Sequence, residues 1–141
     1  MEQDLPAATV TIVLDSEAVS LLARRDVRIQ QTMTAALAMG ERVVVPALVL
    51  AEIMTGKPSD AAVWHVVGRL VTQNVTAKIA ARAGALREKA TLSRAKKRDL
   101  TVDAVVAATA EIMTPVTILT GDPNDFCLLT SGLDIQVLAI G

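Results

Sequence analysis

Acidic residues recur in this sequence where an apolar run ends or where a helix begins. Asp15 follows the run TVTIVL, Glu52 follows VVVPALVLA and Asp122 follows VTILTG. Asp103 lies in TVDAVVAATA, which is typical of the first turn of an apolar helix, and Asp125 comes three residues after Asp122. Carboxylates that repeat at the same kind of structural junction supply the oxygen ligands that hard divalent cations prefer. The first hypothesis for function is therefore a metal-dependent hydrolase.

Each of these acids also has a purely structural explanation. Asp15 and Asp122 are suited to cap the helices that follow them, and Asp103 suits the positive end of its own helix. Glu52 is different, because it interrupts the apolar stretch ALVLAEIM, where a buried charge without a partner would be costly. A cation is an economical partner for such a charge, so the four acids together favour a metal site over four independent caps.

The apolar pattern predicts an α/β fold. Short apolar runs alternate with longer helical patterns, which favours a parallel sheet with helices on both faces. The segments 60–71 and 76–90 are expected to pair as a helical hairpin. The expected strands are Val10–Leu14, Val43–Val45, Val116–Leu119 and Ile135–Ile140, and the expected helices are Ser16–Ala23, Val27–Met39, Ala47–Met54, Asp60–Val71, Thr76–Ala90, Thr101–Met113 and Pro123–Leu129.

The direction of a parallel sheet predicts which acids meet. Ligands bind outside the carboxyl ends of the strands in such sheets. Asp15 and Asp122 follow strands, and Glu52 lies in the helix that leaves a strand, so these three should share one edge. Asp134 precedes the last expected strand and should therefore lie at the opposite edge, outside the site.

Composition limits how the chain could bind nucleic acid. Its 141 residues include one Trp, one Phe and no Tyr, so base stacking on aromatic side chains has almost nothing to work with. Eight basic residues and one acid lie between Lys78 and Arg98, whereas six acids and no base follow. The cations Arg94, Lys96, Lys97 and Arg98 have two readings, a solvated helix end or a phosphate-binding rim beside an acidic metal centre.

Nothing in the sequence predicts a membrane or secreted protein. The longest stretch without a charged residue, Ile29–Gly40, is shorter than the roughly 18 residues of a spanning helix. The N-terminal MEQDLP is acidic, whereas a signal peptide begins with basic residues. Cys127 is the only cysteine, so we expect no internal disulfide and a small buried side chain. We expect a cytoplasmic protein.

Other catalytic sites are excluded by missing residues. His65 is the only histidine, so an acid–base histidine pair and a zinc site of the usual His/Cys type are both excluded. The sequence has no GxxxxGK[ST] phosphate loop and no GxSxG nucleophile elbow. An all-carboxylate site for Mg²⁺ or Mn²⁺ is what remains.

The sequence resembles PIN domains and, within them, the VapC-type toxin ribonucleases of bacterial toxin–antitoxin pairs. Four motifs carry the resemblance, IVLDSEAV, VVPALVLAEIMTG, LTVDAVVAATA and ILTGDPNDF, and together they extend over essentially the whole chain. The resemblance implies a single PIN-like nuclease domain over residues 1–141, in which 1–8 form a flexible N-terminus. The implied fold is a three-layer α/β sandwich around a parallel sheet of strand order 3-2-1-4-5.

The resemblance also implies a site and partners. Asp15, Glu52 and Asp103 would form the catalytic centre, Asp122 and Asp125 would complete it, and which of these last two is the closer ligand stays open. The implied metal ligands are Asp15, Asp103 and Asp122. Thr120 would orient a ligand or water, and it is grouped on the substrate side with Arg94, Lys96, Lys97 and Arg98. The implied reaction is Mg²⁺- or Mn²⁺-dependent RNA cleavage that leaves a 5′-phosphate and a 3′-hydroxyl.

The implied partners are RNA, a cognate antitoxin and a second copy of the chain, paired through the region 60–90. The antitoxin would lay its C-terminal segment across a groove and place a basic side chain among the carboxylates. Three other functions stay open: an RNA-processing PIN nuclease without a toxin role, a catalytically silent PIN module, and, less favoured, a receiver-like signalling domain. The last would want paired acids after the first strand and a later Lys, and no Lys follows Lys97.

Overall fold

Five parallel strands form the centre of the structure, a computed structural model that describes residues 9–92 and 99–140. Their spatial order is β3-β2-β1-β4-β5, which confirms the order implied by the resemblance to PIN domains. The strands are β1 Thr11–Leu14, β2 Arg42–Pro46, β3 Val71–Gln73, β4 Val116–Thr120 and β5 Gln136–Ala139.

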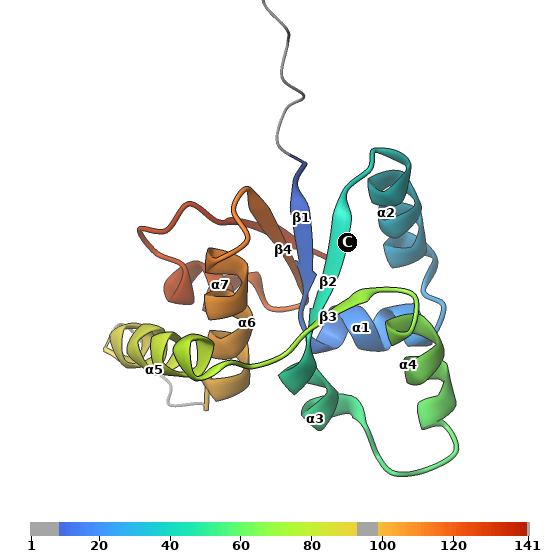
Figure 1. Ribbon diagram of the computed structural model, residues 1–141, viewed down its shortest axis with the longest axis horizontal. Coiled ribbons are helices and arrows are strands. Elements are labelled where there is room, and N and C mark those ends of the chain that lie inside the picture. The colour runs from blue at the N-terminus through green and yellow to red at the C-terminus, as the bar shows by residue number, and fades with distance from the viewer. Residues whose placement is uncertain (1–8, 93–98, 141) are drawn as a thin grey trace, which may run out of the picture.

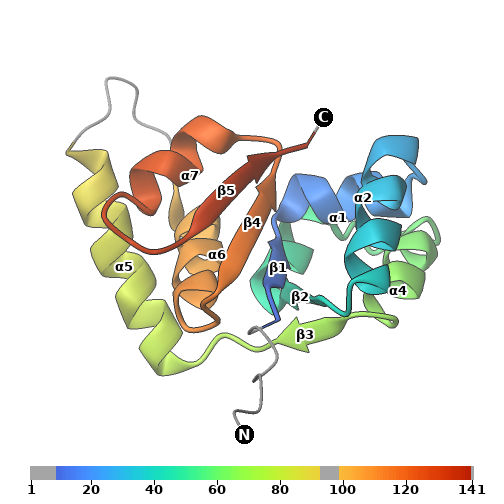
Figure 2. The ribbon, with the colours of Figure 1, turned by 90° about the horizontal axis from the view of Figure 1, so that it is seen from above.

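Helices cover both faces of this sheet. Figures 1 and 2 show α1, α2 and α4 on one side and α5, α6 and α7 on the other, with α3 beyond the end of the sheet. The helices are α1 Ser16–Ala23, α2 Val27–Ala38, α3 Leu50–Ile53, α4 Asp60–Val67, α5 Ala77–Thr91, α6 Thr101–Glu111 and α7 Pro123–Leu129, and a 3₁₀ turn, η1, spans Ala47–Val49. The expected α/β sandwich with a parallel sheet is therefore confirmed.

The central strand is buried along its whole length. Every residue of β1 is buried, and β1 pairs in parallel with both β2 and β4, so Ile12 lies between Val43 and Thr117. A strand covered on both faces can be apolar throughout, which explains why TIVL shows no alternation. The residue that follows β1 is Asp15, and its position is fixed by the best-packed part of the sheet.

Helix α6 is the most deeply buried helix among the described residues. All seven residues from Ala104 to Ala110 are buried, and four of them are alanines. Small side chains let this helix lie close to both the sheet and α5, which it contacts extensively. Asp103 lies in its first turn, at the boundary between this core and solvent, and is partly buried.

The predicted helical hairpin over 60–90 is wrong. A short strand, β3, lies between α4 and α5, and it pairs in parallel with β2. Helix α4 packs against α1, whereas α5 packs against α6 on the opposite face of the sheet. The three residues of β3 are mostly exposed, so they carry no apolar period that the sequence pattern could reveal.

The other element boundaries differ little from the sequence predictions. The expected helix Ala47–Met54 divides into η1 and α3, and most other elements match or end one or two residues away. Across the described residues, no helix combines the length and apolar character needed to span a bilayer. The predicted flexible N-terminus (1–8) and the cations Arg94, Lys96, Lys97 and Arg98 lie outside the described residues.

The packing of α7 generates a stability prediction. Leu129 is 2% exposed, so Leu129→Ala should lower the free energy of unfolding by about 2 to 5 kcal/mol through lost burial and a cavity. Ile112 is 62% exposed, and Ile112→Ala should change it by less than about 0.5 kcal/mol. Urea unfolding followed by circular dichroism measures both. Equal losses in the two variants would contradict the packing described for α7.

Candidate functional site

Asp15 lies at the junction of three elements, and both of its carboxylate oxygens are held. It directly follows β1 and caps α1, where Oδ1 accepts a hydrogen bond from the Ala18 N–H at 2.8 Å. Oδ2 accepts from the Thr120 hydroxyl at 2.6 Å and from the Gly121 N–H at 3.2 Å. Asp15 is only 5% exposed, so these contacts fix a carboxylate inside the protein at the carboxyl end of the sheet.

Burial raises the pKa of Asp15 above its ordinary value of 3.8. Hydrogen bonds from Thr120, Ala18 and Gly121 act in the opposite direction because they favour the ionised form, but they do not cancel the desolvation. The negative charge of Glu17 raises the pKa further. A cation beside Asp15 would relieve both the desolvation and the repulsion.

Thr120 holds Asp15 in place. Its side chain is fully buried, and its hydroxyl accepts a hydrogen bond from the Asp122 N–H at 2.8 Å while donating to Asp15. This relay connects the end of β4, the start of α7 and the end of β1. Thr120 thus orients Asp15, a predicted metal ligand, and its hydroxyl is engaged inside the protein. Its place among the RNA-contacting residues stays a prediction.

Glu52 is exposed on α3, so the prediction that it is a buried charge is wrong. The apolar residues around it, Leu50 and Ile53, are partly buried and pack against the core, while Glu52 faces outward from the short helix. Its carboxylate has a protein partner, because the Ser16 hydroxyl donates a hydrogen bond to Oε1. Glu52 therefore has no buried charge that a cation would have to offset. Its link to the site is the hydrogen bond from Ser16.

A cavity of about 500 Å³ collects the acids. Four of the five predicted catalytic acids line it, contributed by the ends of β1 and β4 and by α3 and α6. Asp134 is exposed ahead of β5, at the amino end of a parallel strand, as predicted. The lining residues are Asp15, Ser16, Glu17, Leu21, Glu52, Asp103, Gly121, Asp122 and Ile140.

The structure separates the roles of Asp122 and Asp125. Asp122 caps α7 and lines the cavity, and its Oδ1 accepts a hydrogen bond from the Asp125 N–H at 3.5 Å. Asp125 is buried inside α7 and is not among the residues that line the cavity. Asp122 is therefore the acid of this pair that is placed to meet a ligand in the cavity.

The donor chemistry of the cavity fits a hard cation, although the acids are not drawn together into a finished site. Within residues 9–92 and 99–140, no group of three or more His, Cys, Asp or Glu side chains is arranged to hold a metal ion. Carboxylate and hydroxyl oxygens dominate the polar lining, and these are the ligands that Mg²⁺ and Mn²⁺ prefer.

Two cavity residues with polar side chains were not predicted from the sequence, Ser16 and Glu17. Both follow Asp15 directly, in the first turn of the helix α1 that Asp15 caps, and both line the same cavity as Asp15. Glu17 passes over Gly121 so closely that a Cβ at Gly121 would lie 2.7 Å from its Cγ. The signal that could have found them is the sequence DSE itself, since a capping acid places the next two side chains at the same rim.

The prediction that Cys127 is a small buried side chain is wrong, because Cys127 is exposed.

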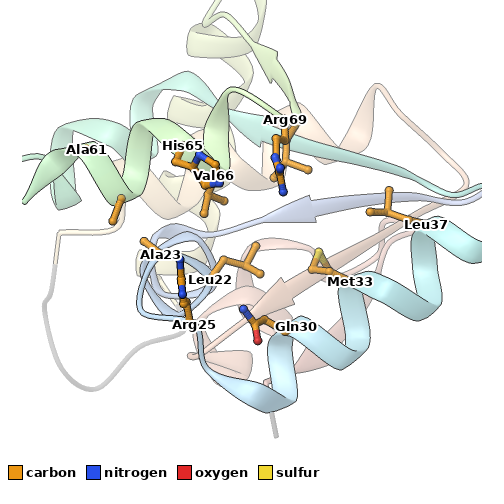
Figure 3. Close-up of a pocket in the computed structure, with 12 residues that line it drawn as sticks. Leu22, Ala23, Arg25, Gln30, Met33, Leu37, Ala61, His65, Val66 and Arg69 are labelled. Atoms are coloured by element: carbon orange, nitrogen blue, oxygen red, sulfur yellow. The ribbon is translucent and has the colours of Figure 1, made fainter.

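A second, larger cavity of about 650 Å³ lies between α1, α2 and α4 and contains no acid (Figure 3). Its walls are mainly apolar, with Leu22, Met33 and Val66 among them, and Arg25, His65 and Arg69 also line it. Volume alone would rank this cavity above the acidic one, but it has no group suited to hydrolysis. Its lining suits a protein segment with an apolar face.

Comparison with known proteins shows the fold. No protein-family model matches the sequence, and no curated protein matches it as a relative. Three similar solved structures are VapBC2 from Rickettsia felis bound to a DNA fragment from its promoter, DNA-bound VapBC from Salmonella typhimurium, and a toxin–antitoxin complex from Klebsiella pneumoniae.

The likeness extends over nearly the whole of each chain. The Rickettsia structure is 15% identical, with 92% of this chain and 98% of that chain covered and a TM-score of 0.71. The Salmonella structure is 14% identical, with 94% of this chain and 100% of that chain covered and a TM-score of 0.72. The Klebsiella structure is 18% identical, with 88% of this chain and 94% of that chain covered and a TM-score of 0.64. At these identities the likeness concerns the fold alone, and it agrees with the α/β fold that the resemblance to PIN domains implies.

The raised pKa of Asp15 generates a prediction about pH and stability. The folded chain favours protonated Asp15, so this residue's contribution to stability is complete below about pH 3.8 and is lost as pH rises through the raised folded pKa. Asn at this position does not titrate. In metal-free buffer, raising the pH from about 3 to 7 should therefore shift the difference in free energy of unfolding between Asp15→Asn and the unchanged chain in favour of the variant.

Urea unfolding at several pH values in the presence of EDTA measures this difference. Comparing the two chains cancels Asp60, Asp99 and Glu111, whose lowered pKa values make stability fall at acid pH in both chains. The prediction is contradicted if the difference in free energy of unfolding does not depend on pH, or if the variant becomes relatively less stable as pH rises. Either result would show that burial is not the main influence on the pKa of Asp15.

Proposed function

We propose that this chain is a Mg²⁺- or Mn²⁺-dependent endoribonuclease and the toxin component of a toxin–antitoxin pair. The observation that carries the proposal is the cavity at the carboxyl end of the sheet, which Asp15, Glu52, Asp103 and Asp122 all line. These acids come from separate elements of a fold that is shared with VapBC complexes. Helix capping accounts for Asp15 and Asp122 but not for Glu52, which caps no helix among the described residues.

The acids of the cavity are supported by different elements of the fold. Asp15 is the rigid ligand, because three hydrogen bonds fix its two oxygens. Asp122 is held at the start of α7 through the hydrogen bond from its N–H to Thr120. Asp103 and Glu52 reach the cavity from α6 and α3. The backbone N–H of Asp125 donates to the Asp122 carboxylate, and the Asp125 side chain is buried.

The chemistry follows from this donor set. A bound Mg²⁺ or Mn²⁺ would supply Lewis acidity, lowering the pKa of a water and offsetting charge on the scissile phosphate. The acids of the chain would orient that cation and, through Glu52 or Asp103, accept the proton of the attacking water. Attack on phosphorus by water, with the 3′-oxygen as leaving group, gives a 5′-phosphate and a 3′-hydroxyl.

RNA would bind mainly through its phosphates. The chain has almost no aromatic side chains to stack on bases, so affinity must come from cations and from the metal centre. Arg94, Lys96, Lys97 and Arg98 stay the predicted phosphate-binding residues on the strength of their sequence. They directly precede Asp99 and α6, the helix that carries Asp103.

The partner proposed for the apolar cavity is the cognate antitoxin. Helix α1 connects the two cavities, since Leu21 lines the acidic one while Leu22 and Ala23 line the apolar one. A segment seated between α2 and α4 could therefore follow α1 to the carboxylates and place a basic side chain there. Such a cation would compete with metal and silence the site. Pairing of two copies and a cytoplasmic location complete the proposal.

Cleavage of structured RNAs tests the enzymatic part. A panel of tRNAs and rRNA hairpins should be cut at one or a few sites with Mg²⁺ or Mn²⁺, and EDTA should prevent this. Asp103→Asn should lower the rate at least about a hundredfold, since the loss of even outer-shell groups at metal sites costs about 10- to 100-fold. Asp134→Asn, at the opposite edge, is the matched control and should cut normally.

Full activity of Asp103→Asn would show that the centre lies elsewhere. Cleavage that persists in EDTA would exclude the metal-dependent mechanism. Metal binding without cleavage of any RNA would favour the silent PIN module.

The proposed partner is tested with the product of a small upstream open reading frame that encodes a DNA-binding antitoxin. Leu37 lines the apolar cavity and is exposed, so Leu37→Glu should fold normally but weaken antitoxin binding at least about tenfold, or about 1.4 kcal/mol. Leu138→Glu is the control, because Leu138 is an exposed leucine on β5, outside this cavity. Isothermal titration calorimetry measures both affinities. Equal affinity of the two variants would place the antitoxin on another surface.

A further inference from the structure

Ser16 connects two elements that both contribute to the acidic cavity. Its hydroxyl donates a hydrogen bond to Oε1 of Glu52, although the two residues are 36 positions apart in sequence. Ser16 belongs to the first turn of α1 and Glu52 to α3, and these helices contact one another. Both residues line the cavity. The contact therefore acts inside the site and not on a remote surface.

Glu52 needs such a partner if its carboxylate is to have a defined place. It is exposed on a helix of only four residues, which follows the 3₁₀ turn η1. An exposed glutamate has three side-chain torsions and loses considerable rotamer freedom when it is fixed. A carboxylate that samples many rotamers is a poor ligand, because binding must then also order the side chain.

Ser16 is a firm point of attachment. It directly follows Asp15, which is buried and held by hydrogen bonds from Ala18, Thr120 and Gly121. Its own side chain has one heavy-atom torsion, so a fixed backbone leaves its hydroxyl little freedom. Because Ser16 is the next residue after the fixed Asp15, its hydrogen bond to Glu52 restricts the position of the Glu52 carboxylate.

The chemistry of the donor also suits a metal site. A serine hydroxyl orients a carboxylate without adding positive charge, whereas a Lys or Arg would neutralise it and repel a cation. The hydrogen bond uses one acceptor position of the carboxylate, and the remaining lone pairs can still face a ligand. Groups that hydrogen-bond to metal ligands in this manner commonly set the affinity of the site.

We propose that Ser16 is a positioning residue, which holds the Glu52 carboxylate at the cavity so that Glu52 binds the divalent cation together with Asp15. The inference rests on the proposed metal site and adds to it a residue that acts through Glu52. Ser16 itself contacts neither the cation nor the substrate.

A double-mutant cycle on Mn²⁺ affinity tests this. Mn²⁺ binding to the full chain without RNA is measured by electron paramagnetic resonance for the unchanged protein, Ser16→Ala, Glu52→Ala and the double variant. Ser16→Ala should weaken binding about tenfold when Glu52 is present and should have no effect when Glu52 is replaced by Ala. Ser16→Thr, which keeps the hydroxyl, should restore most of the affinity.

Two controls separate positioning from a structural role. Ser20→Ala removes a partly buried hydroxyl one turn further along α1, outside the cavity lining, and should leave Mn²⁺ affinity unchanged. Urea unfolding of the metal-free variants should show that Ser16→Ala folds as the unchanged chain does.

The outcomes distinguish this inference from the proposed function. If Glu52→Ala weakens binding but Ser16→Ala does not, the role of Ser16 is overturned and the metal site stands. An equal loss for Ser16→Ala in both backgrounds would overturn the action through Glu52. If the unchanged chain binds no Mn²⁺, the metal-dependent function fails and the inference fails with it.

Discussion

The buried carboxylate of Asp15 is the constraint on which the rest of the site depends. Its oxygens accept hydrogen bonds from the first turn of α1 and from the connection between β4 and α7. Thr120 extends this set of contacts to the N–H of Asp122. One side chain thereby ties together the ends of two adjacent parallel strands and the starts of two helices. The other acids of the cavity are then placed around a buried carboxylate whose two oxygens are hydrogen-bonded.

This arrangement has an electrostatic cost in the absence of a ligand. The residues that line the acidic cavity include five acids and no Lys, Arg or His. Burial and the charge of Glu17 raise the pKa of Asp15, so ionisation of this carboxylate costs more in the folded chain than in water. Sites that reduce stability in this way are typical of function, because packing alone would not retain them. A divalent cation would turn the same repulsion into attraction.

The sequence predicted the sheet and the acids for a common physical reason. Buried parallel strands are continuous apolar runs, and an acid directly after such a run marks the carboxyl end of a strand, so Asp15, Asp122 and the contrasting position of Asp134 followed from local pattern. Strand β3 was missed because three exposed residues carry no period, and its pairing with β2 depends on backbone contacts. The false hairpin over 60–90 came from the same omission.

Contacts between distant residues account for most of the other differences. The exposure of Glu52 follows from the shortness of α3 at the end of the sheet, where only one side of the helix packs on the core. The side-chain hydrogen bonds of Ser16 and Thr120 are made to partners 36 and 105 positions away, which no local pattern encodes. Asp122 and Asp125 were equivalent in sequence, and only the course of α7 separates the cavity-lining acid from the buried one.

The central claim is that acids from separate elements bind one divalent cation in one cavity. Titration of the ¹⁵N-labelled full chain with Mn²⁺, followed by nuclear magnetic resonance, tests it most directly because the ion broadens the signals of nearby amides. The account predicts that amides around Asp15, Glu52, Asp103 and Asp122 broaden together at the lowest Mn²⁺ concentrations. Those of Asp134 and Glu111, far from the cavity lining, should stay sharp. Broadening centred elsewhere, or spread evenly over the acidic surface, would contradict it.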